Sequence, residues 1–269
     1  MKLLTIADTE YEEFEPHFDE TYNIGVDQVA PEVVESELEV RLNGHTVDEF
    51  DAAFMDIPVK NAVFGRVMIE MIEEKNVSVN YPSTAFFVMA KKNYLYYVLH
   101  ERGVPAPRTV TLATEKAARN IANEIEPPLI ARRMEELEET ETKKLDDRDE
   151  IKGFAEGSEY EEDVLIFHEY DDGDKYRCLV IGDQVISLKE DSESWRFTGD
   201  NLKYSNISDT QKEIVMKTKR ALGTPVAEIL IRGEQVFDID PNPDLQGYSD
   251  VSGKNTFEAV AEVLKGEED

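Results

Sequence analysis

The chain has one cysteine, Cys178, among its 269 residues. A single thiol excludes an internal disulfide, and the flanking letters YRCLVIG are typical of a buried strand. We therefore interpret Cys178 as a small core residue of a protein from a reducing cytoplasm. Histidine is nearly as scarce, and its four copies stand far apart in the sequence, which does not favour a histidine metal site. We interpret each of them, His168 included, as a structural or surface residue.

Long apolar runs are also missing. No window approaches the roughly 18 apolar residues that a membrane-spanning helix needs, so we expect no membrane partner. The opening letters MKLLTIADTEYEEF contain an apolar run that is too short for a signal peptide. No G-x-G-x-x-G fingerprint supports a dinucleotide cofactor.

Basic residues are few beside the acidic ones. Lysine and arginine number 29 against 59 aspartates and glutamates, which gives a formal net charge of -30. Such a chain would be repelled by a phosphate backbone, so we expect no nucleic-acid partner. The acids form either a solvated surface suited to concentrated salt or a binding surface for cations and basic partners. Because they are spread over the whole chain, we favour salt adaptation and expect a halophilic archaeal source.

Apolar periodicity predicts an α/β protein, with α+β character in its C-terminal part. Residues 1–80 alternate strand and helix patterns, which indicates a parallel α/β unit. Residues 81–165 open with one helix, STAFFVMAKKNYLYYVLHERG, continue with a helix over EKAARNIANEI, and then give a strand in PPLIARRM. Residues 166–269 contain two hairpins, KYRCLVIGDQVISLKE and VAEILIRGEQVFDIDPNP, and helices after them. The helix over SDTQKEIVMKTKRALG is expected to have its cap at Ser208 or Asp209.

The second of these hairpins carries a group of carboxylates. Alternation places Asp238 and Asp240 on one face, about 7 Å apart along the strand. Pairing around Gly233 would bring Glu228 opposite them. Three converging carboxylates repel one another unless a cation neutralises them, and oxygen ligands without histidine or cysteine favour magnesium. The alternative is an edge hairpin with solvated acids.

Two segments in this order give the chain a family resemblance. NYPSTAFFVMAKKNYLYYVLHERGVPAPRT has a lysine-bearing helix followed by Gly-Val-Pro-x-Pro-x-Thr. VFDIDPNPDLQGYSDVSG has a strand that ends in acidic residues, followed by proline, glycine and Ser-Gly. The chain thus resembles the ATP-grasp superfamily, in the branch of glutathione synthetase and the RimK-like ribosomal-protein glutamate ligases. The resemblance covers essentially the whole chain, and it implies three units: a Rossmann-like α/β domain that precedes the ATP-grasp fold over residues 1–80, a small ATP-grasp subdomain with the entry helix over residues 81–165, and a C-terminal ATP-grasp subdomain with the metal site over residues 166–269.

The resemblance implies ATP and Mg²⁺ as cofactors, with Mn²⁺ as an alternative ion, and it implies a role for each matching residue. The family's nucleotide-binding positions correspond in this sequence to Lys92 (or its neighbour Lys91), Arg132, Glu169, Tyr170 and Asp174. Catalytic arginines match Arg177 and Arg196. Magnesium ligands match Glu228, Asp238 and Asp240, with aspartate at the last position where asparagine is usual.

The implied reaction is carboxylate–amine ligation. A carboxylate takes the γ-phosphoryl group of ATP, and an amine then displaces phosphate from the acyl-phosphate. The partners would be a small-molecule or peptide carboxylate and an amine acceptor such as glutamate. A homo-oligomer and a monomer both stay open.

One segment departs from the family pattern. The glycine-rich hairpin that covers the triphosphate in the family is replaced by MEELEETET, residues 134–142, with five glutamates and no glycine. Glutamates over an anion are unfavourable unless the hairpin folds away or Lys143 and Lys144 face inward. Two further hypotheses therefore stay open: a nucleotide-binding relative without catalysis, in a regulatory or scaffold role, and an unrelated acidic α/β binding domain.

Overall fold

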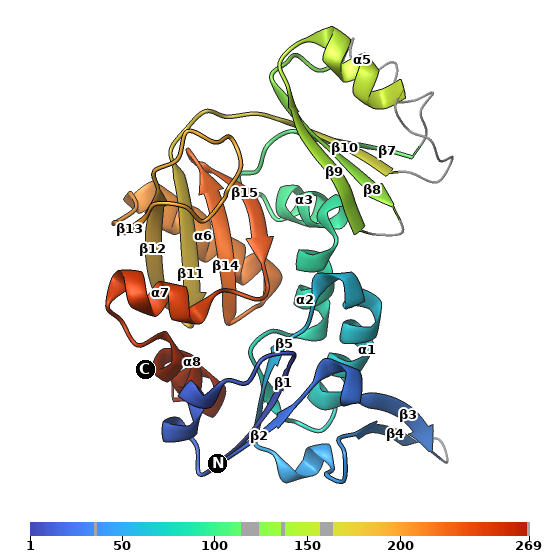
Figure 1. Ribbon diagram of the computed structural model, residues 1–269, viewed down its shortest axis with the longest axis vertical. Helices are drawn as coiled ribbons and strands as arrows, with labels where there is room; N and C mark the ends of the chain where they lie inside the picture. Colours follow the sequence, from blue (N-terminus) through green and yellow to red (C-terminus); the bar gives the residue numbers. More distant parts are fainter. Residues whose placement is uncertain (35–36, 114–123, 136–137, 157–163, 268–269) are drawn as a thin grey trace.

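The computed structural model describes residues 1–34, 37–113, 124–135, 138–156 and 164–267 (Figure 1). Helices and sheets are both present, as predicted. None of the helices in these ranges is long and apolar enough to cross a membrane. The helix expected over EKAARNIANEI lies almost entirely outside the described residues.

The N-terminal part is built on a parallel sheet. Its strand order is β2-β1-β5-β6, and β1 is almost wholly buried, which explains why its sequence is a continuous apolar run rather than an alternating one. An antiparallel hairpin, β3–β4, extends beside it. The strands are β1 (Lys2–Ala7), β2 (Glu20–Ile24), β3 (Ala30–Val34), β4 (Glu37–Arg41), β5 (Ala52–Asp56) and β6 (Ser78–Val79).

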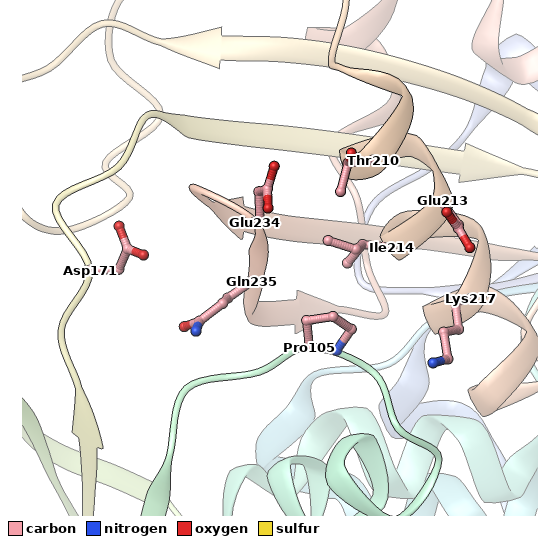
Figure 2. Close-up of a pocket in the computed structure, with 8 residues that line it drawn as sticks. All are labelled: Pro105, Asp171, Thr210, Glu213, Ile214, Lys217, Glu234 and Gln235. Carbon is pink, nitrogen blue, oxygen red and sulfur yellow. The ribbon is translucent and has the colours of Figure 1, made fainter.

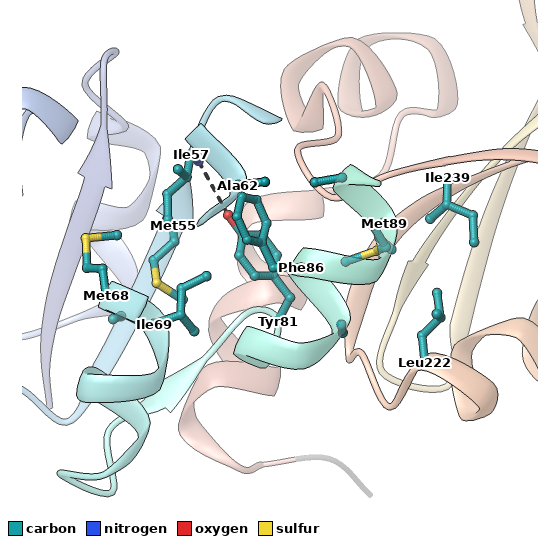
Figure 3. Close-up of a cluster of buried hydrophobic side chains, with 14 of the residues drawn as sticks. Met55, Ile57, Ala62, Met68, Ile69, Tyr81, Phe86, Met89, Leu222 and Ile239 are labelled. Atoms are coloured by element: carbon teal, nitrogen blue, oxygen red, sulfur yellow. Dashed lines mark hydrogen bonds between the residues drawn. The ribbon is translucent and has the colours of Figure 1, made fainter. Parts of the chain in front are cut away.

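Helix α1 (Ala62–Glu73) packs closely on α2 (Ser83–Ala90). Gly65 makes this approach possible, because a β-carbon at that position would lie 2.6 Å from Cε1 of Phe86. Figure 3 shows Phe86 stacked beside Tyr81, whose hydroxyl accepts a hydrogen bond from the Ile57 amide (3.4 Å).

The single helix predicted from residue 83 onward is two helices. Lys91 has φ -111° and ψ 91°, an extended conformation that ends α2 and begins α3 (Lys92–Glu101). The continuous apolar pattern concealed this break, because both helices are buried on several sides. Lys92 is thereby placed in the first turn of α3.

A small antiparallel sheet follows, in the order β7-β10-β8-β9, with its own apolar core. Helix α5 (Arg148–Glu156) covers it (Figure 1). The expected boundary at residue 165 falls inside β10, so this sheet extends to Glu169. Its strands are β7 (Thr109–Leu112), β8 (Leu129–Glu135), β9 (Glu138–Leu145) and β10 (Val164–Glu169).

A larger antiparallel sheet forms the C-terminal part, in the order β13-β12-β11-β14-β15. Both expected hairpins are present. Helix α6 (Asp209–Leu222) has the predicted cap at Ser208 and ends at Gly223, which has a φ of 68° that favours glycine. The strands are β11 (Lys175–Ile181), β12 (Gln184–Glu190), β13 (Leu202–Tyr204), β14 (Val226–Arg232) and β15 (Gln235–Asp240).

The last helices connect this sheet to the N-terminal part. Helices α7 (Leu245–Ser252) and α8 (Thr256–Lys265) follow β15, and α8 packs against the N-terminal sheet. The ring of Phe257 lies 5.2 Å from that of Phe14 and 6.3 Å from that of Tyr11. The N-terminal sheet and the large sheet therefore share a core. This core crosses the unit boundaries expected at residues 80 and 165.

We predict that Gly65→Ala lowers the free energy of unfolding by about 1–3 kcal/mol, because the new methyl group overlaps Phe86. Urea unfolding at constant salt measures this. Gly153→Ala in α5 is the matched control, since a β-carbon at that position would have nothing within 4 Å and alanine favours the helix. Equal stability of the two variants would contradict the packing described for α1.

Candidate active site

The β14–β15 hairpin presents acidic side chains where it approaches the other parts of the chain. Its two strands turn at Gly233–Glu234, and the register places Glu228 opposite Asp240 and Leu230 opposite Asp238. The predicted pairing of Glu228 with the Asp238–Asp240 strand is therefore confirmed. A bulge between Leu230 and Ile231 separates this end from the turn.

Asp238 lies between two cations from distant elements. Lys92, at the start of α3, donates to the Asp238 carboxylate and to the Ile239 carbonyl oxygen (3.0 Å). Nη2 of Arg132, on β8, donates to Oδ2 of Asp238 (3.3 Å). Burial would raise the pKa of Asp238, but the charges of Lys92 and Arg132 outweigh it and lower that pKa.

Three acceptors fix the Arg132 guanidinium. Besides Asp238, its Nε donates to Nε2 of His168 (3.1 Å) and its Nη1 to Glu139 on β9 (2.7 Å). Burial, with Arg132 close by, lowers the pKa of His168 well below its usual value, so the ring is neutral and can accept this bond. The sequence pattern favours a structural or surface role for His168; the residue is fully buried and orients Arg132.

The other two predicted metal ligands have different partners. Glu228 accepts hydrogen bonds from Nη1 of Arg177 (2.8 Å) and from the hydroxyl of Tyr248 (2.9 Å). Asp240 accepts the backbone amide of Asn242 (2.9 Å). Burial raises the pKa of Glu228 and of Asp240, and the charge of Asp240 adds to the effect on Glu228.

These contacts divide the predicted metal ligands into two sets. Within the described ranges, no group of three or more His, Cys, Asp or Glu side chains is arranged to hold a metal ion. Asp238 is paired with two cations, whereas Glu228, which is paired with Arg177, lies opposite Asp240 in the strand register, and both of these carboxyl groups have raised pKa values. The oxygen donors of this opposed pair fit a hard divalent cation such as Mg²⁺, which uses few protein ligands.

A buried ion pair holds the segment after β12 against this end of the large sheet. Nζ of Lys175 donates to Glu190 (2.9 Å) and to the carbonyl oxygens of Ser194 (2.8 Å) and Arg196 (2.9 Å). Glu190 also accepts the Thr198 amide (2.9 Å). We call residues 191–199, which are fixed by these bonds, the strap.

The strap joins the two sheets at the site. Arg196, a predicted catalytic residue, is exposed and donates to the carbonyl oxygen of Thr142 on β9. The ring of Phe197 packs 5.4 Å from that of Phe237, next to Asp238. Arg177 reaches both the strap anchor Glu190 (3.4 Å) and Glu228.

The structure gives different surroundings to three predicted nucleotide-binding residues, Glu169, Tyr170 and Asp174. The hydroxyl of Tyr170 accepts a bond from Nη1 of Arg232 (3.0 Å), and the ammonium group of Lys144 lies 4.8 Å from the Tyr170 ring centre. Glu169 and Asp174 are exposed and pair with surface cations, Arg108 (3.7 Å) and Lys189 (2.8 Å) respectively. Tyr170 is thus turned toward the neighbouring elements, whereas Glu169 and Asp174 make only surface ion pairs in the described structure.

A separate cavity of about 460 Å³ lies beside α6 (Figure 2). Asp171, Glu213 and Glu234 line it together with Lys217, which donates to the Gly103 carbonyl oxygen. The three predicted metal ligands, Glu228, Asp238 and Asp240, do not line it. We do not assign it to the candidate active site.

Several residues of the site were not predicted from the sequence. Lys175 and Glu190 stand directly opposite each other in the β11–β12 register, so pairing of opposite charges across that hairpin could have identified them. The roles of His168 and Tyr248 depend on contacts between separate sheets and helices, for which no local pattern exists.

The chain is similar to known ligases, although no protein-family model matches it. Two curated relatives are named "Probable alpha-L-glutamate ligase": that of Xylella fastidiosa is 21% identical over 237 residues, covering 83% of this chain and 79% of the relative. That of Cellvibrio japonicus is 24% identical over 228 residues, covering 79% and 75%.

Solved structures are similar over nearly the whole chain. A RimK domain ATP-grasp protein from Sphaerobacter thermophilus has a TM-score of 0.74 at 16% identity, covering 99% of this chain and 100% of its own. The ATP-grasp ligase PsnB, in complex with minimal precursor, Mg and ADP, has a TM-score of 0.69 at 15% identity, covering 98% and 97%. D-alanine–D-alanine ligase from Bacillus anthracis has a TM-score of 0.69 at 13% identity, covering 98% and 96%. The chain therefore has the ATP-grasp fold.

Proposed function

We propose that the protein is an ATP-dependent carboxylate–amine ligase. One observation carries the proposal: Lys92 and Arg132, from different parts of the fold, converge on Asp238 beside the opposed pair of Glu228 and Asp240. Cations next to carboxylates suit a nucleoside triphosphate bound with a divalent ion. The phosphate oxygens would bind the cationic side chains, and the carboxylates would bind the divalent ion. The ATP-grasp fold and the relatives' names support the same activity.

Each cation has a part in this reaction. Lys92 and Arg132 would bind phosphate oxygens and hold the triphosphate in line with the acceptor carboxylate. Arg177 would stabilise the charge that develops on the acyl-phosphate, because it already lies against Glu228 with a second carboxylate at its Nε. Arg196, on the strap, would close the site against β9 and exclude water.

Glu228 and Asp240 are the residues that would hold Mg²⁺. When bound, the ion neutralises the negative charge of phosphate oxygens during transfer. Mn²⁺, which takes similar oxygen ligands, is an alternative. In this proposal Asp238 positions Lys92 and Arg132 rather than serving as the principal metal ligand, which refines the expectation of three equal ligands.

The acceptor and donor are proposed by chemical class. Relatives named as α-L-glutamate ligases favour an amino acid such as glutamate as the amine. Neighbours solved with precursor peptides favour a peptide carboxylate as the acyl donor. The high acidic content supports the further proposal that the protein works in the concentrated salt of a halophilic cytoplasm.

Phosphate release in concentrated salt tests the proposed ligase activity. The protein, MgATP and a peptide carboxylate are combined with a panel of amino acids, and mass spectrometry follows the product. We expect phosphate release that depends on an amine and forms one amide per phosphate. ATP binding without any amide product across the panel would contradict a ligase.

A second candidate function is nucleotide binding without turnover. Glu139 supports it, because this glutamate of the altered hairpin bonds Arg132, one of the cations assigned to phosphate. Residues 136–137 of that hairpin lie outside the described residues. Among the described ones, Glu141 pairs instead with Arg133 (3.3 Å) and Lys143 (2.5 Å).

We predict that Glu139→Gln tightens MgATP binding about tenfold, because it removes a carboxylate that competes with phosphate for Arg132. Calorimetry at fixed salt measures the affinity. Glu141→Gln is the matched control, since its partners are other cations of the hairpin. Equal affinities for the two variants would show that Glu139 does not compete with phosphate.

We predict that Asp240→Asn stabilises the metal-free protein at neutral pH, because the amide removes a charge that burial disfavours. The raised pKa means that the folded state holds this proton more tightly, so wild-type stability falls as pH rises through the window above the usual aspartate pKa. The amide keeps an oxygen for the Asn242 amide but carries no charge.

The same variant should lose the stabilisation that Mg²⁺ gives to the wild type. Thermal unfolding with and without Mg²⁺ measures both effects, and exposed Asp200→Asn serves as the control. A variant that Mg²⁺ still stabilises as strongly as the wild type would remove Asp240 from the proposed site.

A further inference from the structure

The outer face of α1 is unusual for so acidic a chain. Residues 57–69 contain no aspartate or glutamate, although acids make up 59 of the 269 residues overall. Three of the large apolar side chains that are exposed in the described structure lie here: Val59 (42% exposed), Val63 (58%) and Val67 (47%). A contiguous apolar strip on a highly charged surface indicates contact with another molecule.

The inner face of the same helix is packed in the hydrophobic core. Ala62, Met68 and Ile69 point into the core shared with α2, as Figure 3 shows. Gly65 allows the close approach of Phe86. The exposed valines are therefore not turned outward by a poorly packed helix; they form a second face that α1 does not need for its own fold.

The outer face has a regular pattern. Exposed side chains recur at intervals of three and four residues, in the order Lys60, Val63, Val67, Glu70, Glu74. Lys60 lies in the 3-10 turn that precedes α1, and Glu74 directly follows the last residue of α1. This spacing is that of a helical seam that packs against another helix. Its first member is a cation, its middle is apolar, and its last two members are anions.

Such a stripe is complementary to itself when reversed. An antiparallel second copy, related by a twofold axis near Val67, would set Lys60 of each chain against Glu74 of the other and Val67 against Val67. The neighbouring Arg66, exposed and 5.0 Å above the Phe87 ring, would lie near Glu70 of the second copy. A parallel arrangement would instead place like charges side by side.

We propose that the protein forms a twofold dimer through antiparallel packing of α1 against α1 of a second copy. In Figure 1, α1 lies on the side of α2 that is away from the large sheet, so the dimer leaves the candidate active site open. Two chains of net charge -30 repel each other, and the stretch 57–69, which carries no aspartate or glutamate, lets them approach where this repulsion is weakest. This inference does not depend on the ligase proposal.

Two conditions on the dimer follow from its physics. Screening by salt should strengthen it, since the long-range repulsion between the chains falls faster with salt than the contact of the valines. A single pair of 12-residue helices buries a modest area, so the dimer should dissociate on dilution.

Sedimentation velocity in concentrated salt tests the seam. We expect a species of twice 30.7 kDa that grows with protein concentration. Lys60→Glu and Glu74→Lys should each raise the dissociation constant about tenfold, and the double variant should restore it, because the reversed charges pair again. A monomer at every concentration overturns the proposal, and so does a double variant as weak as the singles.

Cysteine crosslinking tests the register directly. The one native cysteine, Cys178, is fully buried and gives a clean background. Oxidation of Val67→Cys should yield a disulfide-linked dimer, because the axis brings the two copies of this residue together. Val251→Cys, exposed on α7, is the control and should stay monomeric. Equal crosslinking of the two variants would contradict a dimer centred on Val67.

Discussion

The Asp238 carboxylate holds together three parts of the chain that are far apart in sequence. Lys92 comes from the helix that follows the N-terminal domain, and Arg132 comes from the small sheet; both bind Asp238 at the end of the large sheet. A buried carboxylate without these cations would cost several kcal/mol, and the cations would repel each other without it. Phosphate oxygens, like this carboxylate, are negatively charged hydrogen-bond acceptors, and on this ground we propose that the arrangement accepts a nucleotide.

The rest of the fold fixes the position of Asp238. Asn242, two residues beyond Asp240, donates to the Ile57 carbonyl oxygen (2.7 Å) and accepts from the Tyr81 hydroxyl (3.2 Å). Together with the packing of α8, these bonds make the large sheet and the N-terminal sheet one body. The small sheet, with a separate core, meets this body at Arg132 and at the bond from Arg196 to β9.

The sequence predicted those features that depend on local patterns. Turn residues and alternation were sufficient to place Glu228 opposite Asp240 and to cap α6 at Ser208, because each depends on a few neighbouring residues. The break at Lys91, the His168–Arg132 bond and the union of α8 with the N-terminal core were not predictable, since each is set by packing between distant segments. For the same reason, sequence alone treated three carboxylates as equivalent, whereas contacts separate Asp238 from the other two.

The affinity of Lys92→Met for MgATP, measured by calorimetry in concentrated salt, is the direct test of whether Lys92, held by Asp238, binds the nucleotide. Methionine keeps much of the volume of the side chain but removes the charge that Asp238 holds in place. We expect binding to weaken by about a hundredfold, the loss expected when one charge-assisted contact to phosphate disappears. Affinity equal to that of the wild type would contradict the proposal that Lys92 and Asp238 form the nucleotide site.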